Sequence, residues 1–219
     1  MYFLPFYFQA VKGTSAEGSG IRIIAYLVSN TIASIVVGVS ITTFGYYTPF
    51  MMLGSMIFCV GCGLLYTLQV DSSAGHWIGY QLLAGVGSGA GIQIPFIAVQ
   101  VVLSEKDMPT GNAIAIFFNT LGGAVSISIA QNIFTNKLVS ALRTDVPNAN
   151  VATIIAAGAA HIKDVVTPEQ LPGTLRAYNT GVTSAFILPI AVTSIAFLCS
   201  LFVEWKSVKG KKIAPGGAA

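Results

Sequence analysis

The sequence predicts an all-α integral membrane protein from its charge pattern, its composition and the length of its apolar stretches. Residues 23–70, 72–104, 108–136 and 177–203 contain no Asp, Glu, Lys or Arg. Only 9% of the 219 residues are charged and the mean hydropathy is +0.75, whereas soluble domains are about 25% charged. The uncharged stretches reach the roughly 20 residues that a spanning helix needs, and they lack the period-two alternation of membrane strands. A charge at the bilayer centre costs several kcal/mol, so these stretches suit hydrocarbon rather than water.

Turn residues divide these stretches into one partial span and five full spans. The apolar opening at 1–10 reaches about half-way across a membrane, so we expect a truncated first helix there. The full spans are expected at about 22–44, 50–68, 76–103, 111–134 and 178–203. Pro95 lies inside the long fourth stretch and predicts a kink or a tilt. Together, residues 1–205 are expected to form a transmembrane helical bundle in the lipid bilayer.

The loops and the chain end give an orientation. Residues 206–219 form a basic tail with four lysines directly after the last span. Because short positively charged segments stay in the cytosol, the tail is expected to be cytosolic. Counting spans back from it, the long loop at 136–175 is expected to be external.

Small residues mark the expected helix contacts. Glycines at 85, 87, 89 and 91 form two pairs with four-residue spacing, which lets a neighbouring helix backbone approach closely. Gly122 and Gly123 suggest a further close contact. The alternative for the first group, a phosphate-binding loop, needs a preceding strand and a soluble helix start, and the surrounding apolar run offers neither.

Polar residues inside the spans must face protein or a water-filled cavity. Asn112, Asn119 and Ser126 recur every seven residues and share one helix face, and Gln93 and Gln100 share another. Asn30 and Gln81 lie in two further spans. Several inward polar faces favour a central cavity. The alternative is hydrogen bonding between helices that only stabilises the bundle, at roughly 0.6 kcal/mol for each bond.

Several function classes find no support in the sequence. It has no paired carboxylates within or beside a span, no G-x-S-x-G and no H-E-x-x-H, so we expect no enzyme and no cofactor. The pair Cys59 and Cys62 lacks the further ligands of a zinc site, so no metal is expected. A net charge of +3 without a basic stripe gives no support for nucleic-acid binding. No ionisable residue lies mid-span, so a proton-binding group is not expected on this chain.

An ordered set of motifs resembles the C-terminal half of fungal fourteen-helix drug:proton antiporters of the major facilitator superfamily. The motifs are YFLPFYFQAVKG at 2–13, SGIR at 19–22, GYYTP at 45–49, YQLLAGVGSG at 80–89, QIP at 93–95, FNTLGG at 118–123, LPG at 171–173 and AYN at 177–179. The resemblance covers nearly the whole chain. It implies the C-terminal six-helix half of a major facilitator fold with its first helix truncated, in a multidrug or mycotoxin efflux pump.

The resemblance also implies a mechanism and partners. Rocking of two halves around a midplane site would export small amphipathic or apolar compounds at the expense of a proton gradient. This requires an N-terminal half of six to eight helices that the chain lacks, and the plasma membrane is the expected location. The expected substrate-binding residues are Gln9, Asn30, Gln81, Gln93 and Asn119. The alternatives are a non-transporting truncated protein, a subunit that depends on a partner, and a small oligomeric channel.

Overall fold

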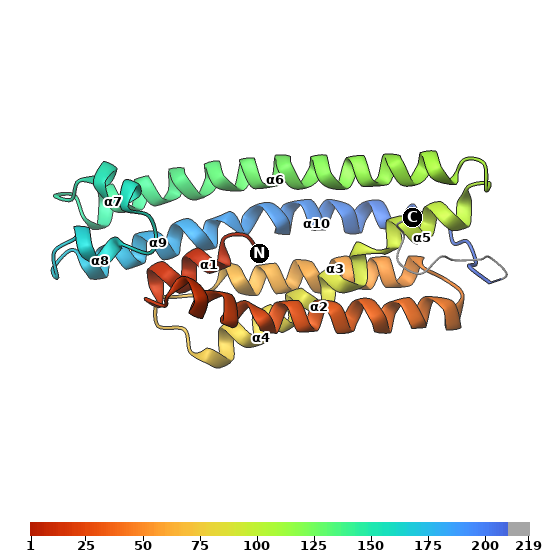
Figure 1. Cartoon of the computed structure of the whole chain (residues 1–219), viewed down its shortest axis with the longest axis horizontal. Helices are drawn as coiled ribbons and strands as arrows, with labels where there is room; N and C mark the ends of the chain where they lie inside the picture. Colours follow the sequence, from red (N-terminus) through yellow and green to blue (C-terminus); the bar gives the residue numbers. More distant parts are fainter. Residues whose placement is uncertain (210–219) are drawn as a thin grey trace.

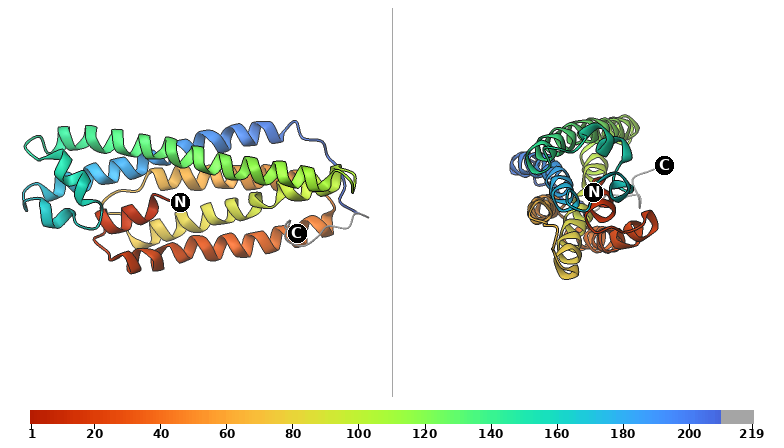
Figure 2. Two further views of the ribbon diagram at one scale, coloured as in Figure 1. Left: turned by 45° about the horizontal axis from the view of Figure 1, so that its top comes forward. Right: turned by 90° about the vertical axis from the view of Figure 1, so that its left-hand side faces the viewer.

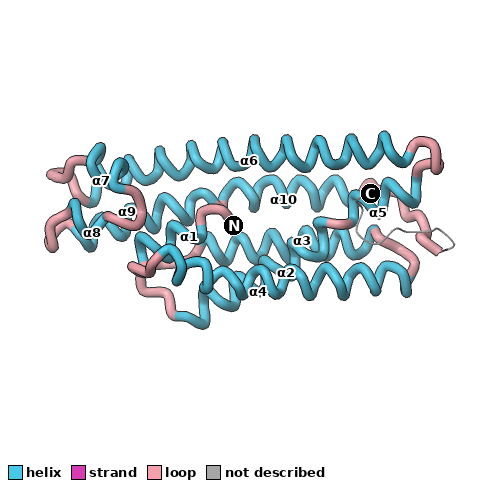
Figure 3. Tube along the Cα trace, viewed as in Figure 1, coloured by secondary structure: helices cyan, strands magenta, loops and turns pink. Residues whose placement is uncertain are grey.

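The computed structural model describes residues 1–209 as a bundle whose long helices run along one long axis (Figure 1). The connections gather at the two ends of this axis (Figure 3). We call the end with residues 12–15, 67–73 and 146–170 the cap end. The opposite end, with residues 45–47, 103–107 and 201–209, is the tail end. Residues 210–219 of the predicted basic tail lie outside the described part of the chain.

Within residues 1–209, five helical segments are long and apolar enough to cross a membrane, which confirms the predicted fold class. They are α2 (Ala16–Phe44), α3 (Thr48–Tyr66), α4 (Ala74–Ile92) with α5 (Ile94–Val102), α6 (Met108–Asp145), and α9 (Leu171–Ala185) with α10 (Ile187–Ser200). The opening segment is helical as well, with α1 (Leu4–Phe6) continuing into the π-helix η1 (Tyr7–Val11).

Local sequence signals set several helix ends. The Ser15 side chain caps α2 by accepting a hydrogen bond of 3.0 Å from the Gly18 amide. Gly45 ends the same helix with a φ of +86°, a left-handed conformation that glycine adopts without strain. Pro49 stands in the first turn of α3, where a missing amide proton does no harm.

Two of the spanning segments are interrupted. The first interruption is at Gln93, and Pro95 occupies the opening turn of α5. The second is at Phe186, three residues before Pro189, and separates α9 from α10. Proline removes an intrahelical hydrogen bond and clashes with the preceding turn, which accounts for both positions. The sequence predicted one continuous span at about 178–203, where the structure has α9 and α10.

Helix α6 is longer than predicted and replaces the first quarter of the expected 136–175 loop. Its buried residues Ala130, Phe134, Leu138 and Leu142 repeat every four positions and continue one apolar stripe towards Asp145. The helix ends just before Pro147, which disfavours a helical residue ahead of it. Beyond it, α7 (Val151–Ala157) and α8 (Ile162–Val165) bury Ile154 and Ile162 in the main core, so this segment is a packed cap.

The helices pack in a fixed order. Helix α4 lies between α2 and α3, α3 contacts α10, and α9 contacts α6. The end-on view of Figure 2 shows the helices arranged around the short opening segment α1–η1. The main apolar core fills the cap-end half, and a smaller cluster around Ile41, Tyr47 and Val208 closes the tail end.

Candidate transport pathway

Gln81 is the most enclosed of the predicted polar residues. Its side chain is 0% exposed, and neither its amide nitrogen nor its amide oxygen has a hydrogen-bond partner among the described residues. It lies one turn from Trp77 and one turn from Gly85 on the same face of α4. Trp77 packs edge-on against Phe8 at 5.0 Å between ring centroids. A buried unpaired amide is costly, so this position needs a hydrogen-bonding partner that the described residues do not supply.

Asn30 lies where α2 meets α4. It is half-buried, and its backbone carbonyl faces Gly89. Two hydrogen bonds join the helices on either side of it: Tyr26 donates to the Ser88 hydroxyl (2.9 Å), and Ser34 donates to the Gly89 carbonyl (3.0 Å). Asn30 and Gln81 therefore belong to two helices joined by a polar seam.

The glycines of α4 let its neighbours approach closely. A methyl group on Gly85 would collide with the Ser29 hydroxyl and the Tyr26 carbonyl, and one on Gly89 would collide with the Asn30 carbonyl. One on Gly87 would collide with the backbone of Phe58. The other glycines of the predicted packing set have no such neighbour: nothing described lies within 4 Å of the same position on Gly91, Gly122 or Gly123.

The remaining predicted residues lie apart from the seam. Gln93 is exposed at the interruption between α4 and α5, and Asn119 is exposed on α6. Gln9 donates to the Ser19 hydroxyl (3.1 Å) and lines a cavity of about 190 Å³ at the cap end, shared with Thr14 and Lys163. Of the five predicted residues, only Asn30 and Gln81 lie on the two helices, α2 and α4, that the seam joins.

A larger cavity of about 270 Å³ lies midway along the bundle between α3, α6, α9–α10 and the start of the chain. Its lining is mostly aromatic and aliphatic, including Phe3, Phe58 and Phe186, and the hydroxyl-bearing residues in it are Tyr2, Ser126 and Thr193. None of the five predicted binding residues lines it. Ser126 belongs to the seven-residue repeat with Asn112 and Asn119 that the sequence showed, whereas no sequence signal distinguishes the aromatic residues.

Side chains from two distant segments fix the loop between α3 and α4. Its backbone carbonyls accept hydrogen bonds from side chains in η1, in α9 and at Lys12, the residue directly after η1. The pairs are Tyr7 to Gln69 (2.8 Å), Lys12 to Val70 and Ser72 (2.7 Å each), and Asn179 to Leu68 (3.0 Å). We call this set the loop clasp. Burial lowers the pKa of the Lys12 ammonium group, and the nearby Asp71 carboxylate acts in the opposite direction.

Other chemistry finds little support within residues 1–209. These residues contain no group of three His, Cys, Asp or Glu side chains that could hold a metal ion. Cys59 and Cys62 are free thiols, and Cys59 approaches the Ser194 hydroxyl at 3.3 Å, which joins α3 to α10. The structure gives this pair a packing role.

Comparison with known proteins confirms the resemblance seen in the motifs. The chain is 44% identical over 209 residues to the efflux pump roqT of Penicillium rubens, covering 95% of this chain and 39% of that protein. It is 42% identical to the MFS-type transporter astH of Aspergillus oryzae, covering 97% of this chain and 38% of that protein. It is 45% identical to the aspyridones efflux protein of Neocamarosporium betae, again covering 97% and 38%.

The chain thus spans about two fifths of the length of these relatives. All three are named as transporters or efflux proteins, and astH is named as a transporter of the major facilitator type, the class that the motifs indicated. No protein-family model matches the chain.

Proposed function

We propose that this chain is the C-terminal membrane part of an exporter of small amphipathic or apolar compounds. The observation that supports this most strongly is the match of 95% or more of the chain, at 42–45% identity, to three proteins named as transporters or efflux pumps. The mid-bundle cavity, with aromatic walls and hydroxyl groups, suits a ligand with much apolar surface and few polar atoms.

The proposed mechanism is alternating access against a second bundle. Such transporters move two halves around a site near the bilayer midplane. Two observations support a second bundle. Residues 113–125 of α6 are almost wholly exposed, and the chain matches only about two fifths of each relative. A proton gradient is the proposed energy source. Because the described spans carry no charged side chain at mid-depth, the proton-binding group would belong to that other half.

The proposed substrate contacts are amides that bind without charge. Gln81 and Asn30 would act from the seam between α2 and α4, and Gln93 and Asn119 from exposed positions on α4–α5 and α6. Gln9 would act at the cap end, beside the smaller cavity. Gln81 is enclosed in this conformation, so it would meet a substrate only in a state in which the surrounding helices separate. A plasma-membrane location with a cytosolic C-terminus completes the proposal.

A split transporter tests this function. The chain is expressed in a fungal host with reduced export, alone and together with the N-terminal part of the efflux pump roqT, and accumulation of an amphipathic fluorescent dye is measured. We expect lower accumulation only when both parts are present. Unchanged accumulation, with both parts found in the membrane and associated, would contradict the proposal and favour a non-transporting protein.

Point variants test the proposed contacts in the same assay. Gln93→Ala and Asn119→Ala remove exposed amides without disturbing packing, so we expect altered dye export at unchanged membrane level. Gln131→Ala is the matched control, because Gln131 is also exposed on α6 but lies on a different face from Asn119. Export equal to that of the parent in the first two variants removes these residues from the site.

A further inference from the structure

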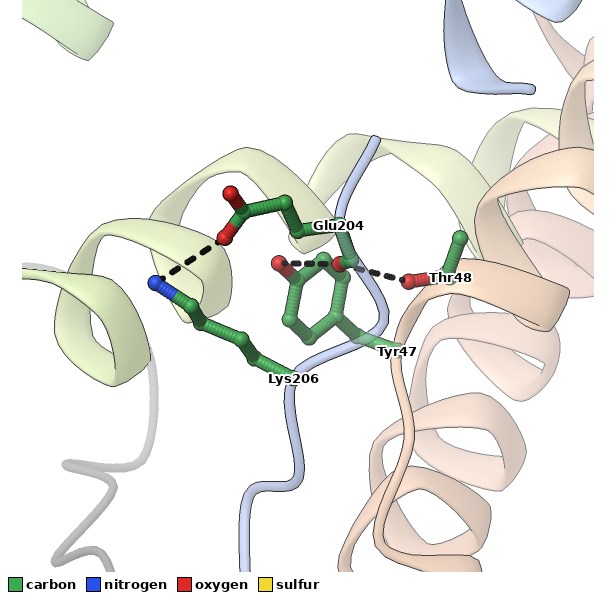
Figure 4. A network of polar contacts seen from close by, with 4 residues as sticks. All are labelled: Tyr47, Thr48, Glu204 and Lys206. Carbon is green, nitrogen blue, oxygen red and sulfur yellow. Dashed lines mark hydrogen bonds and ion pairs between the residues drawn. The ribbon is translucent and has the colours of Figure 1, made fainter. Parts of the chain in front are cut away.

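The segment after α10 does not leave the bundle directly. Residues 201–209, which we call the tail strap, fold back onto the turn between α2 and α3. The Val208 amide donates to the Gly45 carbonyl (2.9 Å), and the Glu204 carbonyl accepts from the hydroxyls of Tyr47 (3.3 Å) and Thr48 (3.4 Å) (Figure 4). Val208 is 3% exposed within the tail-end apolar cluster. These contacts hold the backbone of the strap in place.

The outward side of the tail strap carries large aromatic residues. Phe202 is 89% exposed and Trp205 is 61% exposed, and the Trp205 ring lies 6.4 Å from that of Tyr46. The strap follows directly on the last spanning segment and covers the point where α2 ends. In a membrane this is the level of the lipid headgroups, where Trp and Tyr rings are favoured.

Lysines accompany these rings. The Lys206 ammonium group binds the Glu204 carboxylate (3.0 Å) and keeps 46% of its side chain exposed. The Lys209 stem lies over Gly45, close enough that a methyl group there would come within 2.8 Å of its Cε atom. Residues 201–219 contain four lysines and one glutamate. Within the strap itself, Lys206 and Lys209 against Glu204 leave one net positive charge, whereas the other loop at this end, residues 103–107, contains one lysine and two acidic residues and is net negative.

We propose that the tail strap is a binding site for the headgroups of anionic phospholipids. The ammonium groups of Lys206 and Lys209 would contact the lipid phosphate and carboxylate, while Phe202 and Trp205 enter the boundary between headgroups and acyl chains. Basic residues beside a spanning helix attract anionic lipids through this combination of charge and apolar contact. The strap makes the site specific, because it holds the lysines and the rings against the end of the bundle.

Trp205 provides its own reporter. The chain has two tryptophans, so Trp77→Phe leaves Trp205 as the only one and keeps an aromatic ring at position 77. This variant is placed in lipid nanodiscs that contain fixed amounts of phosphatidylserine and phosphatidylcholine. Bromine atoms, which quench tryptophan, are carried on the acyl chains of one lipid or of the other at equal mole fraction. We expect stronger quenching of Trp205 when the phosphatidylserine is brominated.

Substitutions identify the groups responsible. Each lysine near an anionic surface is worth roughly fivefold in lipid preference, so Lys206→Gln with Lys209→Gln should bring the ratio of the two quenching values close to one. Lys206→Arg with Lys209→Arg should keep the preference. Lys106→Gln, at the same end but in the other loop, is the control that should leave it unchanged.

Two outcomes would overturn the proposal: equal quenching by both brominated lipids in the Trp77→Phe chain, or an unchanged preference in the double glutamine variant. If circular dichroism shows that the double glutamine variant has lost helical content, a salt titration is used in place of that variant. In the Trp77→Phe chain, 0.5 M NaCl should then remove most of the preference, and an unaffected ratio would refute an electrostatic site.

Discussion

Helices α4 and α6 are both apolar and both contain glycine, but they use their surfaces differently. Helix α4 is enclosed between α2 and α3, whereas α6 contacts α9 through its cap-end half and leaves residues 113–125 almost wholly exposed. Within the most apolar stretch of each span, 33% of the residues are buried in Ala74–Val102 and 6% in Met108–Asp145. The difference suggests that α4 is completed by its own chain, while α6 presents a surface suited to lipid or to another bundle.

The largest expected effect comes from filling a close contact on α4. Gly87→Val should destabilise the protein by about 3 kcal/mol, because the new side chain meets the backbone of Phe58 on α3, which cannot move aside. Thermal unfolding in detergent measures this. Gly91→Val is the matched control on the same helix, where an added Cβ atom has no neighbour within 4 Å. Equal losses in both variants would contradict the difference between the two faces.

The next effect concerns the loop that leads into α4. Lys12→Met should cost about 2 kcal/mol, since it removes two hydrogen bonds from a charged donor to the Val70 and Ser72 carbonyls. The loss should appear in the same unfolding measurement. Lys137→Met, an exposed lysine on α6, should change stability little. If the two variants unfold alike, the loop clasp contributes nothing measurable.

A smaller effect is expected at the polar seam. Tyr26→Phe removes the hydrogen bond to the Ser88 hydroxyl and should cost about 1 kcal/mol or less. Ser128→Ala on α6 is a suitable comparison, because Ser128 donates only within its own helix, to the Ala124 carbonyl. A stability loss confined to the Tyr26 variant would support the view that α4, unlike α6, is held by bonds between helices.

The smallest effect on stability should come from α6 itself. Gly122→Ala meets nothing within 4 Å and favours the helix, so the unfolding temperature of this chain should stay the same or rise by the equivalent of about 0.5 kcal/mol. In the split transporter the same change should reduce dye export if a helix of the other half packs there. Normal export would indicate that this part of α6 faces lipid.

The sequence predicted the class of fold because hydrocarbon imposes so simple a rule on side chains. The predicted length of α6 was too short because Asn136 and Lys137 are typical loop residues. The helix continues past them because Phe134, Leu138 and Leu142 form one buried apolar stripe. The interruption at Phe186 was not predicted, because the apolar run continues unchanged through this residue and only Pro189, three positions later, signals a break.

The candidate pathway was harder to predict for a reason of geometry. Periodicity tells which residues share a helix face but not which neighbour that face meets. Gln81 is fully buried one turn from Trp77, and Phe8, from a distant segment, packs against the Trp77 ring. Gln93 is exposed because the helix breaks at that residue. The aromatic wall of the mid-bundle cavity comes from three separate segments, and only a folded chain places them together.

The loop clasp has a practical consequence for labelling this protein. Epitope tags and fluorescent proteins are commonly inserted into short surface loops. Residues 67–73 look suitable for this by length and polarity. An insertion there would detach Lys12, Tyr7 and Asn179 from their acceptors. The stretch around Asn148, exposed between α6 and α7, is the better position for a tag that reports which side of the membrane it faces.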